Sequence, residues 1–196
     1  MLRMTIEPRT LLVIAGLPGS GKSTLLRDAK ANEPVTVLDS DDTRARSAAR
    51  LPGLPYSSYR PLVHVTHRIR VTLAVLTAQG PVVAHDPATG SATRTWLATL
   101  ARISRRPKHF LWVECAPDAA AAGQRARGRV LTRRSFRRHV RRLPGMWALL
   151  RTGLDGWRTT VVVRSVPGLE LRVGEPATDR PRAARTGSPR FAAANR

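Results

Sequence analysis

Short apolar runs alternate along the chain with longer segments in which apolar residues recur every three or four positions. The short runs predict buried β-strands at 10–15, 35–38, 81–85, 109–114 and 159–163. The longer segments predict helices at 57–79, 92–104 and 118–127, and another that starts at Ser135 as its N-cap. Such alternation is typical of a parallel sheet with crossover helices, so we predict an α/β fold.

The clearest helical pattern is the one at 57–79. Its large aliphatic residues recur at helical spacing, and they are Leu62, Val65, Ile69, Leu73 and Leu76. Gly80 and Pro81 end the pattern.

Length, charge and cysteine content limit the class of protein. A chain of 196 residues favours one domain, which we place at 1–173. The remainder, 174–196, mixes Pro, Gly, Ala and Arg without periodicity and predicts a disordered basic tail. The single cysteine, Cys115, excludes an internal disulfide, and we expect it to be a buried structural thiol.

The net charge of +21 suggests an anionic partner such as a nucleotide, a nucleic acid or a membrane surface. Only three of the 34 basic residues are lysines, and a GC-rich genome alone could produce such an arginine bias. The chain has no apolar stretch long enough to span a membrane and no signal-peptide pattern. We therefore expect a cytoplasmic protein.

A glycine-rich motif follows the first predicted strand and precedes a helical segment at 24–30. It reads Gly16, Leu17, Pro18, Gly19, Ser20, Gly21, Lys22, Ser23, Thr24. This is the phosphate-loop pattern in its required context, because glycines let the backbone N–H groups surround phosphate oxygens beside a helix N-terminus. The motif predicts that Lys22 contacts the β- and γ-phosphates of ATP and that Ser23 ligates Mg²⁺.

A cluster of carboxylates follows the second predicted strand, at 39–44. In a doubly wound sheet the carboxyl ends of the strands open onto the ligand crevice, so these acids should face the γ-phosphate. We assign Asp41 as the general base for an attacking hydroxyl and Arg44 as the clamp for an anionic acceptor. The alternative is that Ser40 to Thr43 only cap a helix.

Asp86 ends the third predicted strand, where it could assist Mg²⁺ through water or orient the acceptor. Pro87 follows it, whereas a hydrolytic ATPase usually carries a glutamate there to activate water. A guanine-reading lysine two residues before an aspartate is also missing. These features favour a kinase site specific for ATP.

Four segments resemble the polynucleotide kinase and zeta-toxin-like group of P-loop kinases: the phosphate loop, the Asp-x-Asp-Asp-x-Arg stretch, Asp86, and the arginines at 125–129. The resemblance covers 10–163 and implies a P-loop NTPase three-layer sandwich, with a mostly parallel five-stranded sheet and helices on both faces. It also implies the roles given above for Lys22, Ser23, Asp41 and Arg44. In addition, it implies an arginine-rich lid near 125–134, in which Arg129 or Arg125 neutralises the transferring phosphate. The chain also resembles bacterial proteins described as AAA-family ATPases.

Several alternatives stay open. The arginines of the predicted lid could instead form a solvated basic surface. For His64 and His67 we expect a surface or acceptor-pocket role rather than a metal site. Tyr56 and Tyr59 could line an acceptor pocket or pack internally. The function could be phosphotransfer to a hydroxyl of a small molecule, nucleoside, sugar or nucleic-acid end. It could also be an ATP-dependent switch or nucleic-acid-binding module without transfer.

Overall fold

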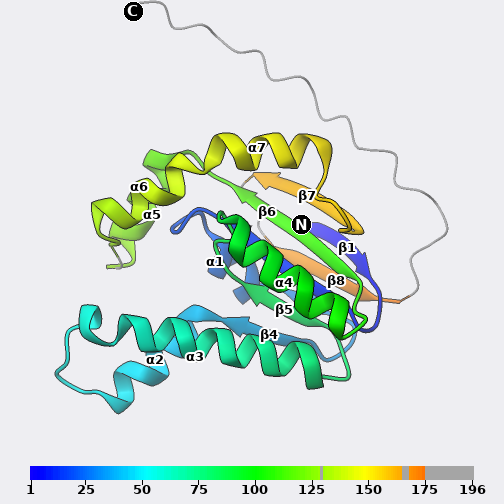
Figure 1. The fold of residues 1–196 in the computed structure, drawn as a ribbon, viewed down its shortest axis with the longest axis horizontal. Helices are drawn as coiled ribbons and strands as arrows, with labels where there is room; N and C mark the ends of the chain where they lie inside the picture. The colour runs from blue at the N-terminus through cyan, green and yellow to red at the C-terminus, as the bar shows by residue number, and fades with distance from the viewer. Residues whose placement is uncertain (129, 165–167, 175–196) are drawn as a thin grey trace, which may run out of the picture.

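A five-stranded parallel sheet forms the centre of the molecule (Figure 1). The computed structural model describes residues 1–128, 130–164 and 168–174. The sheet has the order β4-β5-β2-β6-β7 and consists of β2 (Leu11–Gly16), β4 (Thr36–Asp39), β5 (Val82–His85), β6 (Lys108–Glu114) and β7 (Thr159–Arg164). Every neighbouring pair is parallel. The five predicted strands are confirmed, each boundary within one residue.

Three helices cover one face of this sheet: α3 (Tyr56–Thr77), α4 (Ser91–Ile103) and α7 (Leu143–Thr152). Alternate residues of central strand β2 explain how the core divides. Leu11 and Val13 pack toward these helices, whereas Leu12 and Ile14 pack toward the opposite face. All four are fully buried, as expected for a central parallel strand covered on both sides.

The opposite face is covered by α1 (Lys22–Arg27) together with a second, smaller sheet. This sheet has the order β1-β8-β3 and consists of β1 (Leu2–Ile6), β3 (Lys30–Ala31) and β8 (Leu169–Val173). It was not predicted, although Leu169, Leu171 and Val173 alternate with partly or fully exposed residues, as a half-buried strand requires. Its strands are short, and β1 and β8 come from opposite ends of the chain.

The remaining helices, α2 (Ser40–Arg50), α5 (Pro117–Ala126) and α6 (Arg133–Arg141), follow β4, β6 and α5 respectively. The predicted helices at 57–79, 92–104 and 118–127 are confirmed as α3, α4 and α5. Ser135 was wrong as an N-cap. Thr132 caps α6 instead, because its side chain accepts a hydrogen bond from the backbone N–H of Ser135.

Helix α3 turns its recurring aliphatic residues outward. Leu62, Val65, Ile69 and Leu73 are each more than half exposed, and Leu76 is 42% exposed. The buried row of α3 consists of Tyr59, Val63, His67, Val71 and Val75. No helix among the described residues is both long and apolar enough to cross a membrane.

Candidate functional site

A cavity of about 410 Å³ opens at the carboxyl edge of the five-stranded sheet. The phosphate loop forms one wall, and residues of α2, α3, α5 and α6 form the others. This placement follows from the parallel topology, because the carboxyl ends of β2, β4 and β5 meet at one edge. The volume lies in the range of ligand sites.

The phosphate loop lies directly against α5. Gly19 has φ +92°, and a Cβ at this position would lie 2.0 Å from the carbonyl oxygen of Ala120. A Cβ on Gly123 would lie 2.4 Å from the carbonyl oxygen of Gly19. Gln124 completes the contact, since its Nε2 donates to the Pro18 carbonyl at 2.9 Å and its Oε1 accepts from the Leu131 N–H at 3.0 Å. Sequence reasoning missed Gly123 and Gln124.

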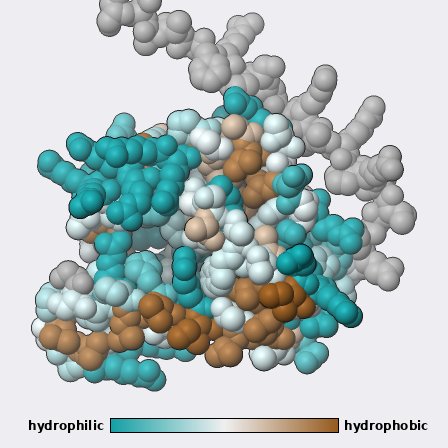
Figure 2. Space-filling model, in the orientation of Figure 1, coloured by the Kyte–Doolittle hydropathy of each residue, from teal (hydrophilic) through white to brown (hydrophobic). Residues whose placement is uncertain are grey.

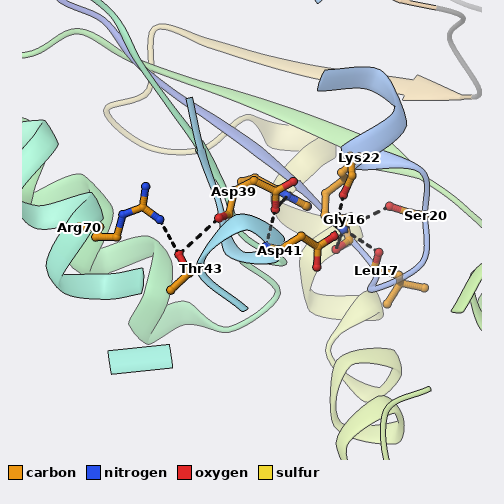
Figure 3. A network of polar contacts seen from close by, with 10 residues as sticks. Gly16, Leu17, Ser20, Lys22, Asp39, Asp41, Thr43 and Arg70 are labelled. Carbon is orange, nitrogen blue, oxygen red and sulfur yellow. Dashed lines mark hydrogen bonds and ion pairs between the residues drawn. The ribbon is translucent and has the colours of Figure 1, made fainter. Parts of the chain in front are cut away.

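Lys22 lies inside the phosphate loop with its side chain buried (Figure 3). Its Nζ donates to the carbonyls of Gly16 at 3.0 Å and Leu17 at 2.8 Å, and to Ser20 Oγ at 3.4 Å. Burial lowers the pKa of this ammonium to about 8, although the carboxylates of Asp86 and Asp39 oppose the shift. The only lysine of the motif is therefore held where the loop backbone surrounds it.

Asp41 reaches the phosphate loop from the first turn of α2. Its Oδ2 accepts a hydrogen bond from Ser23 Oγ at 3.3 Å, so the predicted metal-binding hydroxyl and the predicted base lie side by side. The capping alternative named Ser40 to Thr43, but the N-cap lies one residue before them. Asp39 is the N-cap of α2, and its Oδ1 accepts from the Asp41 N–H at 2.9 Å.

The partly buried Asp39 also pairs with the buried His85, a contact that sequence reasoning missed. The two residues end neighbouring strands in register, and His85 Nδ1 lies 2.6 Å from Asp39 Oδ1. Burial alone would raise the pKa of Asp39, but the hydrogen bond and the charge of His85 lower it. This pair fixes the carboxyl ends of β4 and β5 beneath the cavity.

The other two carboxylates of the site region differ in position. Asp86 lines the cavity, and its Oδ1 accepts from the Ala88 N–H at 2.7 Å. Asp42 is exposed on α2 and does not line the cavity.

Residues of α2 and α3 form another part of the cavity wall. Arg44 lies over the Tyr56 ring, with its Cζ 4.3 Å from the ring centroid. Both residues line the cavity together with His64 and His67, whereas Tyr59 is buried and packs edge-on against Tyr56. Neither ring nitrogen of the buried His67 has a hydrogen-bond partner among the described residues. Burial lowers its pKa, which favours the neutral ring.

The arginines of the predicted lid separate into different positions. Arg125 is exposed on α5 and does not line the cavity. Arg127 does line it, and its Nη2 donates to Thr24 Oγ1 at 3.2 Å. Arg129 lies outside the described residues, as does the predicted tail at 174–196 apart from Gly174.

Cys115 is partly exposed, so the expected buried thiol was wrong. The reason is local: β6 ends at Glu114, and the chain leaves the buried sheet there. Burial still raises the pKa of this thiol, although Lys22 opposes the shift.

The parallel sheet, the glycine-rich loop after its central strand and the helix that starts at Lys22 define a nucleotide-binding P-loop protein of the kinase-like class. The family described as AAA domain matches residues 11–164, and the chain belongs to that family. A comparison with curated protein sequences found no match.

Solved structures with a similar fold include three kinase-like proteins. A candidate kinase from Chloroflexus aurantiacus has a TM-score of 0.53 at 14% identity, over 79% of this chain and 87% of its own. A shikimate kinase from Acinetobacter baumannii has a TM-score of 0.47 at 13% identity, over 82% and 86% of the two chains. A gluconokinase from Sinorhizobium meliloti has a TM-score of 0.43 at 17% identity, over 81% of this chain and 83% of its own. The first of these similarities supports the fold.

Proposed function

We propose that this protein is a kinase that transfers the γ-phosphate of ATP to a hydroxyl of an acceptor bound between α2 and α3. The observation that carries the proposal is the 3.3 Å contact between Ser23 Oγ and Asp41 Oδ2. It brings a carboxylate to the hydroxyl that follows the phosphate-loop lysine, which is where the γ-phosphate of a bound triphosphate would lie.

Two residue sets would hold the donor. The loop from Gly16 to Thr24 would surround the phosphates with its N–H groups, and Lys22 would exchange its loop carbonyls for the β- and γ-phosphates. Ser23 and Asp86 fit Mg²⁺, which prefers oxygen ligands, and both line the same cavity. When bound, Mg²⁺ would neutralise negative charge on the phosphates.

Asp41 would act on the acceptor. The acceptor O–H bond breaks as its proton moves to the Asp41 carboxylate, and the oxygen forms a bond to the γ-phosphorus. The bond from that phosphorus to the bridging oxygen breaks, and its electron pair leaves with ADP.

Arginines would contribute charge at both ends of the cavity. We assign Arg44 to an anionic group of the acceptor, because its guanidinium lines the cavity and makes no ion pair with a described residue. Arg125 and Arg129 remain proposed lid residues that would neutralise the transferring phosphate. Arg127, which already lines the cavity, belongs with them.

The second candidate function is ATP-dependent binding of nucleic acid without phosphotransfer. One observation favours it: five arginines of the α6 segment line a single groove, and they are Arg134, Arg137, Arg138, Arg141 and Arg142. Figure 2 shows a hydrophilic area over the α5 and α6 region. Such a groove would bind phosphates with steep salt dependence.

The test is transfer of labelled γ-phosphate to a panel of 5′-hydroxyl oligonucleotides, nucleosides, sugars and nucleotide sugars. We expect label on one acceptor class. We also expect Lys22→Ala to reduce transfer by roughly a hundredfold or more, because it removes a cation from the transferring phosphate. Lys108→Ala is the matched control, since Lys108 lies near Trp157 at the amino end of β6 and should leave transfer unchanged. Binding of ATP and oligonucleotide without label on any acceptor would support the second function instead.

A further inference from the structure

Two arginines line the cavity from α2 and α3, and they are Arg44 and Arg60. Helix α3 contains no aspartate or glutamate. Among the described residues, neither guanidinium forms an ion pair with a carboxylate. The carboxylates of the described residues that line this cavity are Asp41 and Asp86, and the proposed reaction uses both. This part of the wall therefore keeps two positive charges that favour an anionic ligand.

Arg44 is oriented by an aromatic ring instead of a carboxylate. Its Cζ lies over the Tyr56 ring, 4.3 Å from the centroid. A ring face attracts a cation at this distance but carries no net charge. The contact therefore positions the guanidinium without neutralising it.

Arg60 is held by two neutral groups. Its Nη2 donates to Ser135 Oγ at 3.0 Å, and its Nε donates to His64 Nε2 at 3.4 Å. Burial lowers the pKa of His64 below 6.5, so its ring is neutral at pH 7. A guanidinium has five N–H donors, and these two bonds leave both N–H groups of Nη1 and one of Nη2. That edge can bind two oxygens of a carboxylate or phosphate in parallel.

Both arginines lie near the proposed base. Arg44 follows Asp41 by three residues on α2, so the two side chains are neighbours with Cβ atoms about 5–6 Å apart. Arg60 follows Tyr56 by four residues on α3 and shares its face of the helix. An oxyanion bound by these arginines would lie only a few bonds from a hydroxyl at Asp41. One small molecule can carry both groups.

The cavity also favours a small molecule over a polymer. Its volume of about 410 Å³ would have to hold the donor phosphates as well as the acceptor. The hydrogen bond from Arg60 to Ser135 joins α3 to α6 beside the cavity. The basic groove of α6 is a separate place, since no residue lines both it and the cavity.

We propose that the acceptor is a small hydroxylated oxyanion, whose carboxylate or phosphate is bound by Arg44 and Arg60 while its hydroxyl meets Asp41. Arg60 then determines specificity together with Arg44. This inference rests on the proposed function, because it assigns the acceptor of that reaction. It excludes neutral sugars, nucleosides and oligonucleotide ends as the main acceptors.

The first test is calorimetric titration of the full chain, saturated with Mg²⁺ and a non-hydrolysable ATP analogue so that the phosphate loop is occupied. The probes form two matched sets: glycerol, glycerate and glycerol 3-phosphate, and glucose, glucuronate and glucose 6-phosphate. We expect at least one anionic probe to bind roughly tenfold or more tightly than its neutral parent. The carboxylate and phosphate probes distinguish the two oxyanions. Equal affinity for neutral and anionic probes, or no binding of any anionic probe, would overturn the proposal.

Arg60→Gln tests the specificity residue. It should weaken binding of the anionic probe by roughly tenfold to a hundredfold and leave affinity for the ATP analogue unchanged, because it removes charge-assisted hydrogen bonds to the acceptor. Arg68→Gln is the matched control, since Arg68 is exposed on the same helix, lies over the Trp96 ring and does not line the cavity. It should bind both ligands as the wild type does. Unchanged probe binding in Arg60→Gln, or a loss confined to the ATP analogue, would overturn the assignment.

Transfer of labelled γ-phosphate to the same probes and to a 5′-hydroxyl oligonucleotide separates this inference from the proposed function. Label on the oligonucleotide or on a neutral probe alone would support the kinase and overturn the anionic acceptor. Binding of an anionic probe that depends on Arg60, without label on it, would support the anion site and contradict phosphotransfer.

Discussion

At the residue scale, His139 shows how the basic surroundings of the cavity control one side chain. Its Nδ1 lies 2.8 Å from Thr89 Oγ1, and it lines the cavity from α6. Burial lowers its pKa to about 4, and the charges of Arg142 and Lys22 add to the shift. The ring is therefore neutral at pH 7 and becomes protonated only at a cost to the folded state.

The linked prediction concerns stability in acid. The pKa of His139 is lower in the folded protein than the ordinary value of 6.5. The stability that the neutral ring contributes to the folded protein is therefore complete above pH 6.5 and is lost as the pH falls toward 4. His139→Asn should reduce the loss of unfolding free energy across this range, as measured by urea denaturation at a series of pH values. His64 and His67 also have lowered pKa values and titrate in both proteins, so the difference between the two proteins isolates His139. Identical pH profiles would contradict this assignment.

Lys22, Ser23 and Asp41 lie within or beside short segments whose sequence pattern is complete, and the structure brings them to one cavity. Their roles stay predictions. The pairing of Asp39 with His85 and the contact of Gln124 with Pro18 join residues far apart in the chain. No local pattern indicates such contacts, because they depend on strand order and on how a helix docks.

At the element scale, the docking of α5 on the phosphate loop depends on a glycine in each partner. The Gly19 carbonyl occupies the space that a Cβ of Gly123 would need. Because backbone atoms form both sides of this contact, rotamer changes cannot relieve a clash.

Gly123→Ala should therefore displace the loop and weaken ATP binding about tenfold, since overpacking of this kind costs roughly 1–3 kcal/mol. Gly145→Ala on α7 is the control, because its Cβ would meet nothing within 4 Å. That change should leave ATP affinity unchanged and should stabilise the helix by about 0.5–1 kcal/mol. Calorimetric titration with ATP and thermal unfolding measure the two effects. Equal ATP affinity in both variants would show that the contact is dispensable.

Two features of the elements could not be predicted from the sequence. Helical spacing identified the helix that became α3, but only the tertiary structure shows that the Leu62 to Leu76 row points outward while a second apolar row is buried. Strands β1 and β8 likewise contain interpretable alternation, but each is too short to predict pairing with a segment at the other end of the chain.

At the scale of the whole molecule, the arginine excess has several structural uses. Arg106 is buried, and its guanidinium donates to backbone carbonyls of Val75, Ala78, Gly80 and Arg9. The α6 arginines line a groove, whereas Arg44 and Arg127 face the cavity. Net charge alone therefore does not identify a nucleic-acid partner.

In the proposed reaction, Asp41 removes a proton from an acceptor at the end of the phosphate loop. The most direct measurement is the single-turnover rate of γ-phosphate transfer at saturating ATP, with Asp41→Asn beside Asp42→Asn. Asp42 is its exposed neighbour on α2 and does not line the cavity. We predict that Asp41→Asn lowers the rate by roughly a hundredfold to ten-thousandfold while ATP affinity is retained, and that Asp42→Asn has the wild-type rate. Equal rates for the two variants would contradict the role of Asp41 as the general base.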